Sequence, residues 1–259
     1  MIMILSPAKT LDFKTVAPTT RQTMPLFEEE ASGIARIMKK LNAESIANLM
    51  SLSKVLAELN FERFQHWEQN SDPAHRKQAI FAYKGDVYIG LDAYSWKEEK
   101  IDFAQNHLRI LSGLYGYLRP LDLIQPYRLE MGTKLKIKSA KDLVEFWTKK
   151  NTKALLSDLQ LHQSKALINL ASHEYSASID FKKLKVPVIS PQFLDYSNGD
   201  YKMISFFAKR ARGSMASYIC DHKLYDPADI VAFDREGYYY NSNLSSQFKP
   251  VFTRDIQKK

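Results

Sequence analysis

A short, almost uninterrupted apolar run, Ala166–Leu170, restricts the fold of this chain more than any other feature. Such a run is typical of a strand that is buried on both faces, because both faces then meet other apolar side chains. Met1–Leu5 is apolar in the same way, ends at Ser6–Pro7 and has no charged segment before it. This second run therefore predicts another strand rather than a signal peptide, and no run reaches the length of a membrane span.

Helical and extended segments alternate irregularly along the 259 residues. Apolar residues at helical spacing predict helices over residues 26–41, 42–67, 101–111, 141–161 and 208–224. Extended patterns predict strands over residues 79–83, 87–89, 186–194, 201–207, 238–240 and 248–253, with a hairpin turn at 197–200. Because these elements do not follow strict βαβ order and no linker separates them, we expect residues 1–259 to form a single domain of the α+β or mixed α/β class.

Two glycines mark a sharp turn in the segment LRILSGLYGYLRPLDLIQPYRLEMG, which runs from residue 108 to residue 132. Gly113 and Gly116 lack a Cβ atom, so that the backbone can adopt positive φ and approach a ligand closely. Backbone N–H groups at such a turn favour a phosphate group. The same segment carries three arginines, Arg109, Arg119 and Arg128. We therefore predict that it contacts the backbone of a nucleic acid.

Basic residues outnumber acidic residues by 37 to 29, which gives a formal net charge of +8. They gather in three clusters, which are residues 134–153, residues 182–185 and residues 202–212. One cluster alone could be a solvated face, but three clusters beside the glycine turn favour a polyanionic partner such as nucleic acid. The single cysteine, Cys220, gives no disulfide framework, so we expect a protein of the reducing cytoplasm.

Several common catalytic and cofactor-binding motifs are absent from the sequence. It contains neither the phosphate-binding loop of nucleotide hydrolases nor the glycine-rich dinucleotide fingerprint. It also lacks the two-histidine helix of zinc proteases and the nucleophile elbow of serine hydrolases. Its six histidines and one cysteine have no zinc-ligand spacing. We therefore predict no cofactor and no metal site, and a direct iron-sequestering function has no ligand array to support it.

Polar side chains follow both predicted buried strands. Lys9, with the hydroxyl groups beside it, could hold a phosphate at the sheet edge, although an exposed lysine in a turn has the same pattern. Asn169, His173 and Glu174 stand at the exit of the second strand, where sheet proteins commonly bind ligands. His173 and Glu174 could form an acid–base pair and are the candidate catalytic residues. Alternatively, Ser172 caps a helix, and Glu174 belongs to its first turn.

The strand-to-helix segment ISFFAKRARG, residues 204–213, is the most informative of these polar segments. Lys209 and Arg212 are three residues apart, so that they share one face of the predicted helix. Basic residues at the start of a helix oppose the helix dipole, so local structure alone does not favour them there. An anionic partner would explain their presence at this position. Arg128 and Glu130 also share one face of an extended segment, either as a charge pair or in a functional role.

Five segments of this chain resemble the YaaA family of bacterial peroxide-stress proteins. They are SPAKT at residue 6, FAYKGDVYIGL at residue 81, the glycine-turn segment, NLASHEY at residue 169 and ISFFAKRARG at residue 204. The resemblance spans nearly the whole chain and implies an unusual mixed sheet, surrounding helices and a helix-hairpin-helix-like element beside a basic cleft. It also implies a cytoplasmic protein induced by hydrogen peroxide, which binds double-stranded or branched DNA, protects it or assists its repair, and limits harmful iron.

On this resemblance, the helix-hairpin-helix-like element corresponds to about residues 101–126, although Ser112 replaces the usual proline and two residues separate the glycines. The expected DNA-binding residues are Lys9, Arg109, Ser112, Gly113, Tyr115, Gly116, Arg119, Arg128, Lys209, Arg210 and Arg212. We expect a non-enzymatic protein that binds DNA, including damaged DNA, largely without sequence specificity and has no membrane partner. The alternative is an enzyme acting on nucleic acid or a nucleotide in a cleft lined by Lys9, Asn169, His173, Glu174 and Arg212. The sequence leaves the oligomeric state open.

Overall fold

A computed structural model describes residues 1–69 and 71–255. Five of its strands form a central sheet, and their bounds are β1 Ile2–Leu5, β5 Leu108–Ser112, β6 Gly116–Leu118, β8 Leu167–Leu170 and β9 Val188–Ile189. The strand order is β6-β5-β1-β8-β9, in which β6 is antiparallel to β5 and the other neighbours are parallel. The two apolar runs predicted to be buried strands, β1 and β8, are confirmed and pair with each other at the centre of the sheet.

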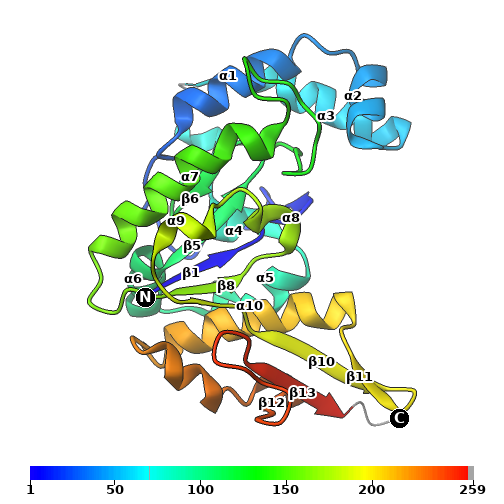
Figure 1. The fold of residues 1–259 in the computed structure, drawn as a ribbon. Coiled ribbons are helices and arrows are strands. Elements are labelled where there is room, and N and C mark those ends of the chain that lie inside the picture. Colours follow the sequence, from blue (N-terminus) through cyan, green and yellow to red (C-terminus); the bar gives the residue numbers. More distant parts are fainter. Residues whose placement is uncertain (70, 256–259) are drawn as a thin grey trace.

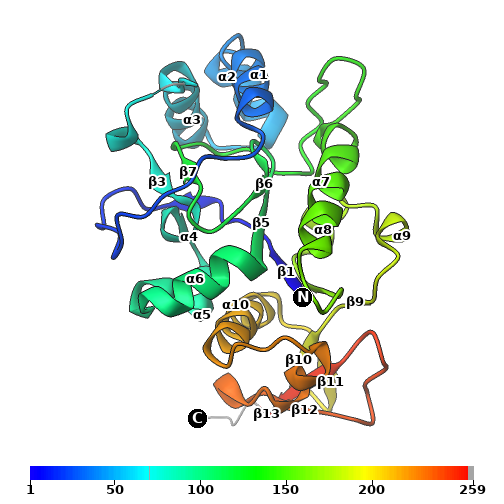
Figure 2. The same ribbon diagram turned by 90° about the vertical axis from the view of Figure 1, so that its left-hand side faces the viewer.

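Helices cover both faces of the central sheet. Their bounds are α1 Glu28–Met38, α2 Ala43–Met50, α3 Lys54–His66, α4 Ala79–Ala82, α5 Asp86–Leu91, α6 Glu98–His107, α7 Leu143–Gln160, α8 His173–Ser176 and α9 Phe181–Leu184. α7, α8 and α9 lie on one face of the sheet, and α4, α5 and α6 lie on the other (Figure 2). α1, α2 and α3 form a group at one end of the molecule (Figure 1). The mixed α/β class predicted from the sequence is thus confirmed.

A second sheet is built from the last part of the described chain. Its strands are β10 Gln192–Ser197, β11 Asp200–Lys202, β12 Tyr239–Tyr240 and β13 Val251–Asp255, in the order β11-β10-β13-β12. The predicted hairpin turn at residues 197–200 is confirmed, and the two last strands, β12 and β13, pair with each other. Helix α10, Ser205–Asp221, lies between the two sheets (Figure 1). It includes Ser205–Phe207, which the sequence pattern had assigned to a strand.

Short elements complete the fold. Two small sheets pair β2 Thr10–Leu11 with β4 Tyr83–Lys84 and β3 Lys77–Gln78 with β7 Leu123–Ile124. The 3₁₀-helices are η1 Pro73–His75, η2 Ala93–Ser95, η3 Pro227–Ala232 and η4 Arg235–Gly237. The strands predicted over residues 79–83 and 87–89 are mostly helical, as α4 and α5. All four residues of α4 are buried, so their apolar pattern does not distinguish a helix from a strand.

The glycine turn is a β-hairpin of the central sheet, and this corrects the helix-hairpin-helix-like element predicted for residues 101–126. α6 ends at His107, and the chain continues directly as β5 rather than as helix up to Leu111. β5 pairs with β1 on one side and with β6 on the other, and all five of its residues are buried. A strand between two neighbours buries apolar residues on both faces, and this explains why the short apolar segment is extended. The short strand β7, rather than a second helix, follows the hairpin.

Two glycines allow α10 to pack closely against α5. A Cβ atom on Gly213 would overlap the carbonyl oxygen of Val87, and one on Gly90 would overlap the carbonyl oxygen of Arg210. The backbones of the two helices therefore touch with no side chain between them. Because α5 belongs to the layer that covers the central sheet, this contact fixes the position of α10 relative to the end of β1.

Candidate functional site

The loops that follow β1 and β8 meet at the carboxyl edge of the central sheet. Because these strands are parallel neighbours, Ser6 and Ser172 reach the same edge. The backbone N–H of Ser172 donates to Ser6 Oγ at 2.8 Å, and the Tyr88 hydroxyl donates to the carbonyl oxygen of Ser6 at 3.2 Å. β5 lies on one side of β1 and β8 on the other, so this edge is a point where the strand order reverses. Open α/β sheets bind ligands at such points.

A cavity of about 270 Å³ opens at this edge. Four cationic side chains line it, and these are Lys9, Lys84, Lys209 and Arg212. Two carboxylates, Asp86 and Glu174, also line it. The lining residues come from the loop after β1, from β4 and α5, from α8 and from α10, which are far apart in the sequence. The structure thus brings together Lys9, Lys209 and Arg212, three of the predicted DNA-binding residues.

Arg212 is the strongest indication that the cavity receives an anion. Its guanidinium group is partly buried, and burial lowers its pKa. Within residues 1–69 and 71–255, no carboxylate lies within 4.0 Å of Arg212 or Lys209, and Nη2 of Arg212 approaches Sδ of Met203 at 4.0 Å. A cation that is withdrawn from water without a counter-ion is unfavourable, so an anionic ligand in the cavity would stabilise it.

The other two cations of the cavity already have carboxylate partners. Lys9 Nζ lies 3.1 Å from Glu130 Oε1, and Lys84 Nζ lies 3.8 Å from a carboxylate oxygen of Asp12. Both lysine side chains are about two-thirds exposed, so these ion pairs contribute little stability. Each lysine can therefore leave its carboxylate partner and bind a ligand with little loss of free energy. Glu130 also accepts from Arg128 at 2.9 Å, so the charge-pair interpretation of Arg128 and Glu130 is confirmed.

Glu174 is the one of the two candidate catalytic residues that lines the cavity. Its Oε1 accepts from the backbone N–H of Gly132 at 3.0 Å, which holds the carboxylate at the cavity wall. His173 precedes it in α8 but is exposed and does not line the cavity. Asn169 does not line it either, because its Oδ1 accepts from the N–H of Ala171. The residues predicted for an enzymatic cleft are therefore only partly brought together.

The hairpin residues predicted to bind DNA are inside the protein. Ser112 and Tyr115 are 0% and 1% exposed, and Gly113 and Gly116 are buried as well. The Ser112 hydroxyl shares a hydrogen bond of 2.6 Å with Tyr127 and accepts from the backbone N–H of Tyr115. No phosphate can reach these backbone groups in this conformation, so the predicted contact surface is not formed here.

Three of the predicted arginines are engaged within the fold and do not line the cavity. Arg109 is buried, and its Nε donates to Asp158 at 2.6 Å. Arg119 binds Asp122, a buried carboxylate, at 3.0 Å. Arg210 lies on the opposite side of α10 from the cavity and pairs with Glu236 at 3.0 Å. These three arginines stabilise the protein's own structure.

Sequence reasoning missed Lys84 and Asp86 as residues of the cavity. The pattern of residues 84–86 predicts a turn, and nothing in it indicates that the turn faces the end of β1. Sequence reasoning also missed a pair of buried tyrosines, Tyr83 and Tyr127, whose hydroxyls share a hydrogen bond of 2.6 Å. Burial raises the pKa of Tyr127 to about 12, so its hydroxyl stays protonated at neutral pH.

Two further properties concern the described part of the chain. No group of three or more histidine, cysteine, aspartate or glutamate side chains in residues 1–69 and 71–255 is arranged to hold a metal ion. None of the helices in the same residues combines the length and the hydropathy needed to cross a bilayer.

The fold and the site define a mixed α/β protein with a cationic cavity at the carboxyl edge of its parallel strands. The sequence model of one family, described as Peroxide stress protein YaaA, matches residues 1–244. A UPF0246 protein of Hahella chejuensis is 48% identical over 255 residues, which cover 98% of this chain and 100% of that relative. A UPF0246 protein of Teredinibacter turnerae is 47% identical over 254 residues, which cover 98% and 99%. The chain therefore belongs to the YaaA family of peroxide-stress proteins, as the five sequence segments predicted.

Proposed function

We propose that this peroxide-stress protein binds DNA largely without sequence specificity, and that one backbone phosphate enters the cavity at the carboxyl edge of the central sheet. By binding DNA in the cytoplasm, it would protect the DNA or assist its repair, and so limit iron-dependent damage. The observation that carries the proposal is the convergence of Lys9, Lys209 and Arg212 on a single cavity. The sequence resemblance predicts the same partner.

The charges of the cavity support a phosphate as the ligand. Arg212 and Lys209 lie three residues apart on α10 and have no carboxylate within 4.0 Å among the described residues. A phosphate diester carries one negative charge and accepts hydrogen bonds from guanidinium and ammonium groups without reference to base sequence. The hairpin around Gly113 has no part in this proposal, because it is buried.

Removing the Lys209 and Arg212 side chains tests the proposal. We expect the double variant Lys209→Ala, Arg212→Ala to bind duplexes of unrelated sequence more weakly and to the same degree for each. Because both side chains would contact the same phosphate, the double variant releases about one counter-ion fewer, and the slope of log K against log salt concentration should become shallower by about 1. Gel-shift titrations between about 50 and 200 mM salt measure both quantities.

The matched control is the double variant Lys149→Ala, Lys153→Ala. It removes the same charge from exposed positions on α7, in one of the other basic clusters and outside the cavity. We expect it to retain most of the wild-type affinity. An equal loss in both double variants would show that total charge, rather than this cavity, carries the binding, and a flat salt response of the wild type would refute DNA binding by phosphate contacts.

A second candidate function is an enzyme that acts on nucleic acid or a nucleotide. The observation in its favour is that Glu174 lines the same cavity as Lys9 and Arg212, so that a carboxylate faces the cationic groups. Such a carboxylate could act as a general base towards a bound phosphate ester. Incubation with branched or oxidatively damaged DNA and divalent metals, followed by mass spectrometry, tests this function. Product formation that Glu174→Gln abolishes would support it, and unchanged DNA would count against it.

A further inference from the structure

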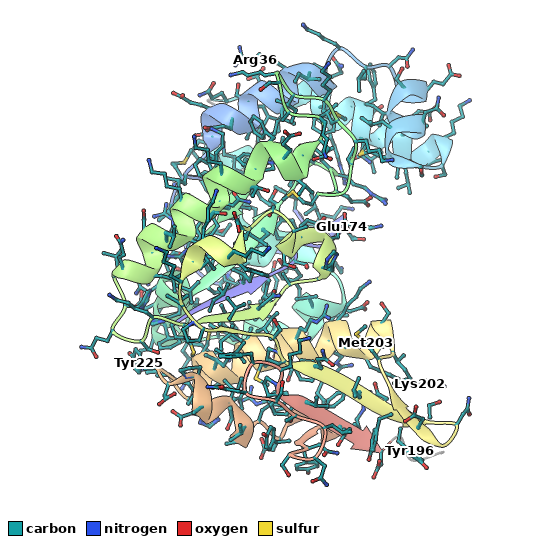
Figure 3. The ribbon with its side chains drawn as sticks, viewed as in Figure 1. Arg36, Glu174, Tyr196, Lys202, Met203 and Tyr225 are labelled. Carbon is teal, nitrogen blue, oxygen red and sulfur yellow. The ribbon has the colours of Figure 1, made fainter. Side chains whose placement is uncertain are left out.

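Two large apolar side chains are exposed beside the cavity, at the start of α10. Met203 is 60% exposed and Phe206 is 52% exposed. Sδ of Met203 lies 4.0 Å from Nη2 of Arg212, which lines the cavity. Phe206 is three residues before Lys209, so the two side chains are neighbours on the helix surface. Figure 3 shows Met203 on the same side of the molecule as Glu174 of the cavity wall.

About half of the Phe206 side chain is exposed among the residues that the structure describes. The core side of α10 is formed by smaller apolar residues, such as Ala208, Ala211 and Met215, and these are buried. The adjacent Phe207 packs against the guanidinium of Arg254, with 4.4 Å between the guanidinium carbon and the ring centroid. Phe206 contacts the Phe207 ring in a T-shaped arrangement, with 5.5 Å between the ring centroids.

The surroundings of Phe206 indicate what covers it. A single exposed apolar side chain is common on protein surfaces and needs no explanation. The Phe206 ring differs because three cationic residues, Lys202, Lys209 and Arg212, are close to it in the sequence. Cationic groups that contact phosphates, combined with an aromatic ring on which a base can stack, are the usual elements of a single-strand binding surface. The positive charge disfavours a basic protein surface or a purely apolar partner and suits a polyanion with aromatic rings.

We propose that Phe206 stacks against an unpaired base of the DNA strand whose phosphate occupies the cavity. The inference rests on the proposed DNA-binding function and defines the class of DNA more closely. Within a continuous duplex both faces of each base are already stacked, so the Phe206 ring can be used only at an unpaired nucleotide, in a single-stranded tail, a flap or an opened position. The preferred ligand is therefore DNA that carries an unpaired nucleotide.

Fluorescence anisotropy with two labelled oligonucleotides tests the inference. One is a blunt duplex, and the other is the same duplex with a four-nucleotide single-stranded tail. We expect the wild-type protein to bind the tailed duplex more tightly than the blunt one. Phe206→Ala should weaken binding of the tailed duplex by about 5- to 150-fold, as expected for the loss of one stacked base, and leave blunt-duplex affinity unchanged. Its salt slope should equal that of the wild type, because no charge is removed.

Further variants separate base stacking from a purely apolar contact and from aromatic exposure elsewhere on the surface. Phe206→Tyr keeps an aromatic face and should retain the affinity for the tail, whereas Phe206→Leu keeps an apolar side chain and should lose it. Tyr225→Ala removes another exposed aromatic ring, 58% exposed and on the other side of the molecule from Met203 (Figure 3), and should bind both probes like the wild type. Because Phe206 is half exposed, its variants should keep the wild-type melting temperature.

The outcomes distinguish this inference from the proposed function. If the wild type binds neither probe, DNA binding itself is refuted. If it binds the blunt duplex and gains nothing from the tail, or if Phe206→Ala binds the tail like the wild type, stacking is refuted while DNA binding stands. Retention of the tail affinity by Phe206→Leu, or an equal loss on both probes in Phe206→Ala, would also overturn the inference.

Discussion

At the scale of single residues, His107 is a histidine held neutral inside the protein. Its side chain is buried, its ring stacks on Phe103 at 4.1 Å between centroids, and its Nδ1 lies 2.8 Å from the carbonyl oxygen of Met1. Burial lowers its pKa from 6.5 to about 4, and the nearby charges of His162, the α-amino group and Arg109 act in the same direction. The hydrogen bond to the Met1 carbonyl opposes this shift but does not overcome it.

This environment predicts a pH dependence of stability. Between pH 6.5 and pH 4 the unfolded chain binds a proton at His107 that the folded chain does not bind. The free energy of unfolding therefore falls as the pH falls through this window, by about 1.4 kcal/mol per pH unit from this group. In His107→Asn this contribution is lost, so urea unfolding between pH 4 and 6.5 should show a shallower slope. His75→Asn, at an exposed histidine, is the control, and an unchanged slope in His107→Asn would contradict the prediction.

Glycines of the hairpin show what a residue type reveals and what it leaves open. A Cβ atom on Gly113 would overlap the carbonyl oxygen of Leu129, and one on Gly116 would overlap the indole ring of Trp147. The sequence analysis predicted that a phosphate approaches these positions, but the groups that do so belong to the protein itself. A sequence indicates that space is needed, and only the tertiary structure identifies what fills it.

At the scale of elements, the contact between α5 and α10 positions two of the four cations of the cavity. Lys209 and Arg212 are both on α10, and Asp86 is at the start of α5. The helices can approach this closely because Gly213 and Gly90 have no side chain. Any group larger than hydrogen at these positions pushes α10 away from the layer that supports the cavity.

The glycine contact gives a stability prediction with an internal control. We expect Gly213→Ala to lower the free energy of unfolding by about 1–3 kcal/mol or more, because the new methyl group meets backbone atoms that cannot move aside. A Cβ atom on Gly33, inside α1, has no atom within 4 Å. Gly33→Ala should therefore stabilise the protein by about 0.5–1 kcal/mol through helix propensity. Urea titrations measure both, and equal effects of the two substitutions would contradict the packing argument.

The long helix and the two buried strands were predicted well from the sequence, and the short buried helices were not. α7 spans 18 residues with a helical period. β1 and β8 have only four residues each, but each lies in an almost uninterrupted apolar run, which is typical of a strand buried on both faces. The predicted helix over residues 42–67 is divided into α2 and α3 at Ser51, whose φ is 52°. α4 and α5 have four and six residues, which is too short for a period to be recognised.

At the scale of the whole molecule, the cavity depends on strand pairing that the sequence does not state. Polar residues after β1 and β8 were predicted to lie at a sheet edge, and they share one edge because these two strands are parallel neighbours. Lys84 reaches the same place through the pairing of β4 with β2, which follows β1. Strands of two residues are too short to produce a recognisable sequence pattern, so only the fold shows that Lys84 belongs to the cavity wall.

The central position of β1 has a consequence for how the protein acquires its structure. Met3 pairs with Leu108 on one side and with Ile168 on the other, so the partners of this strand are more than a hundred residues further along the chain. During synthesis, β1 leaves the ribosome long before either partner and remains an unpaired apolar segment until they follow. Parallel pairing over such separations is slow and leaves apolar surface open to aggregation. We therefore expect the nascent chain to be prone to aggregation until β8 has emerged.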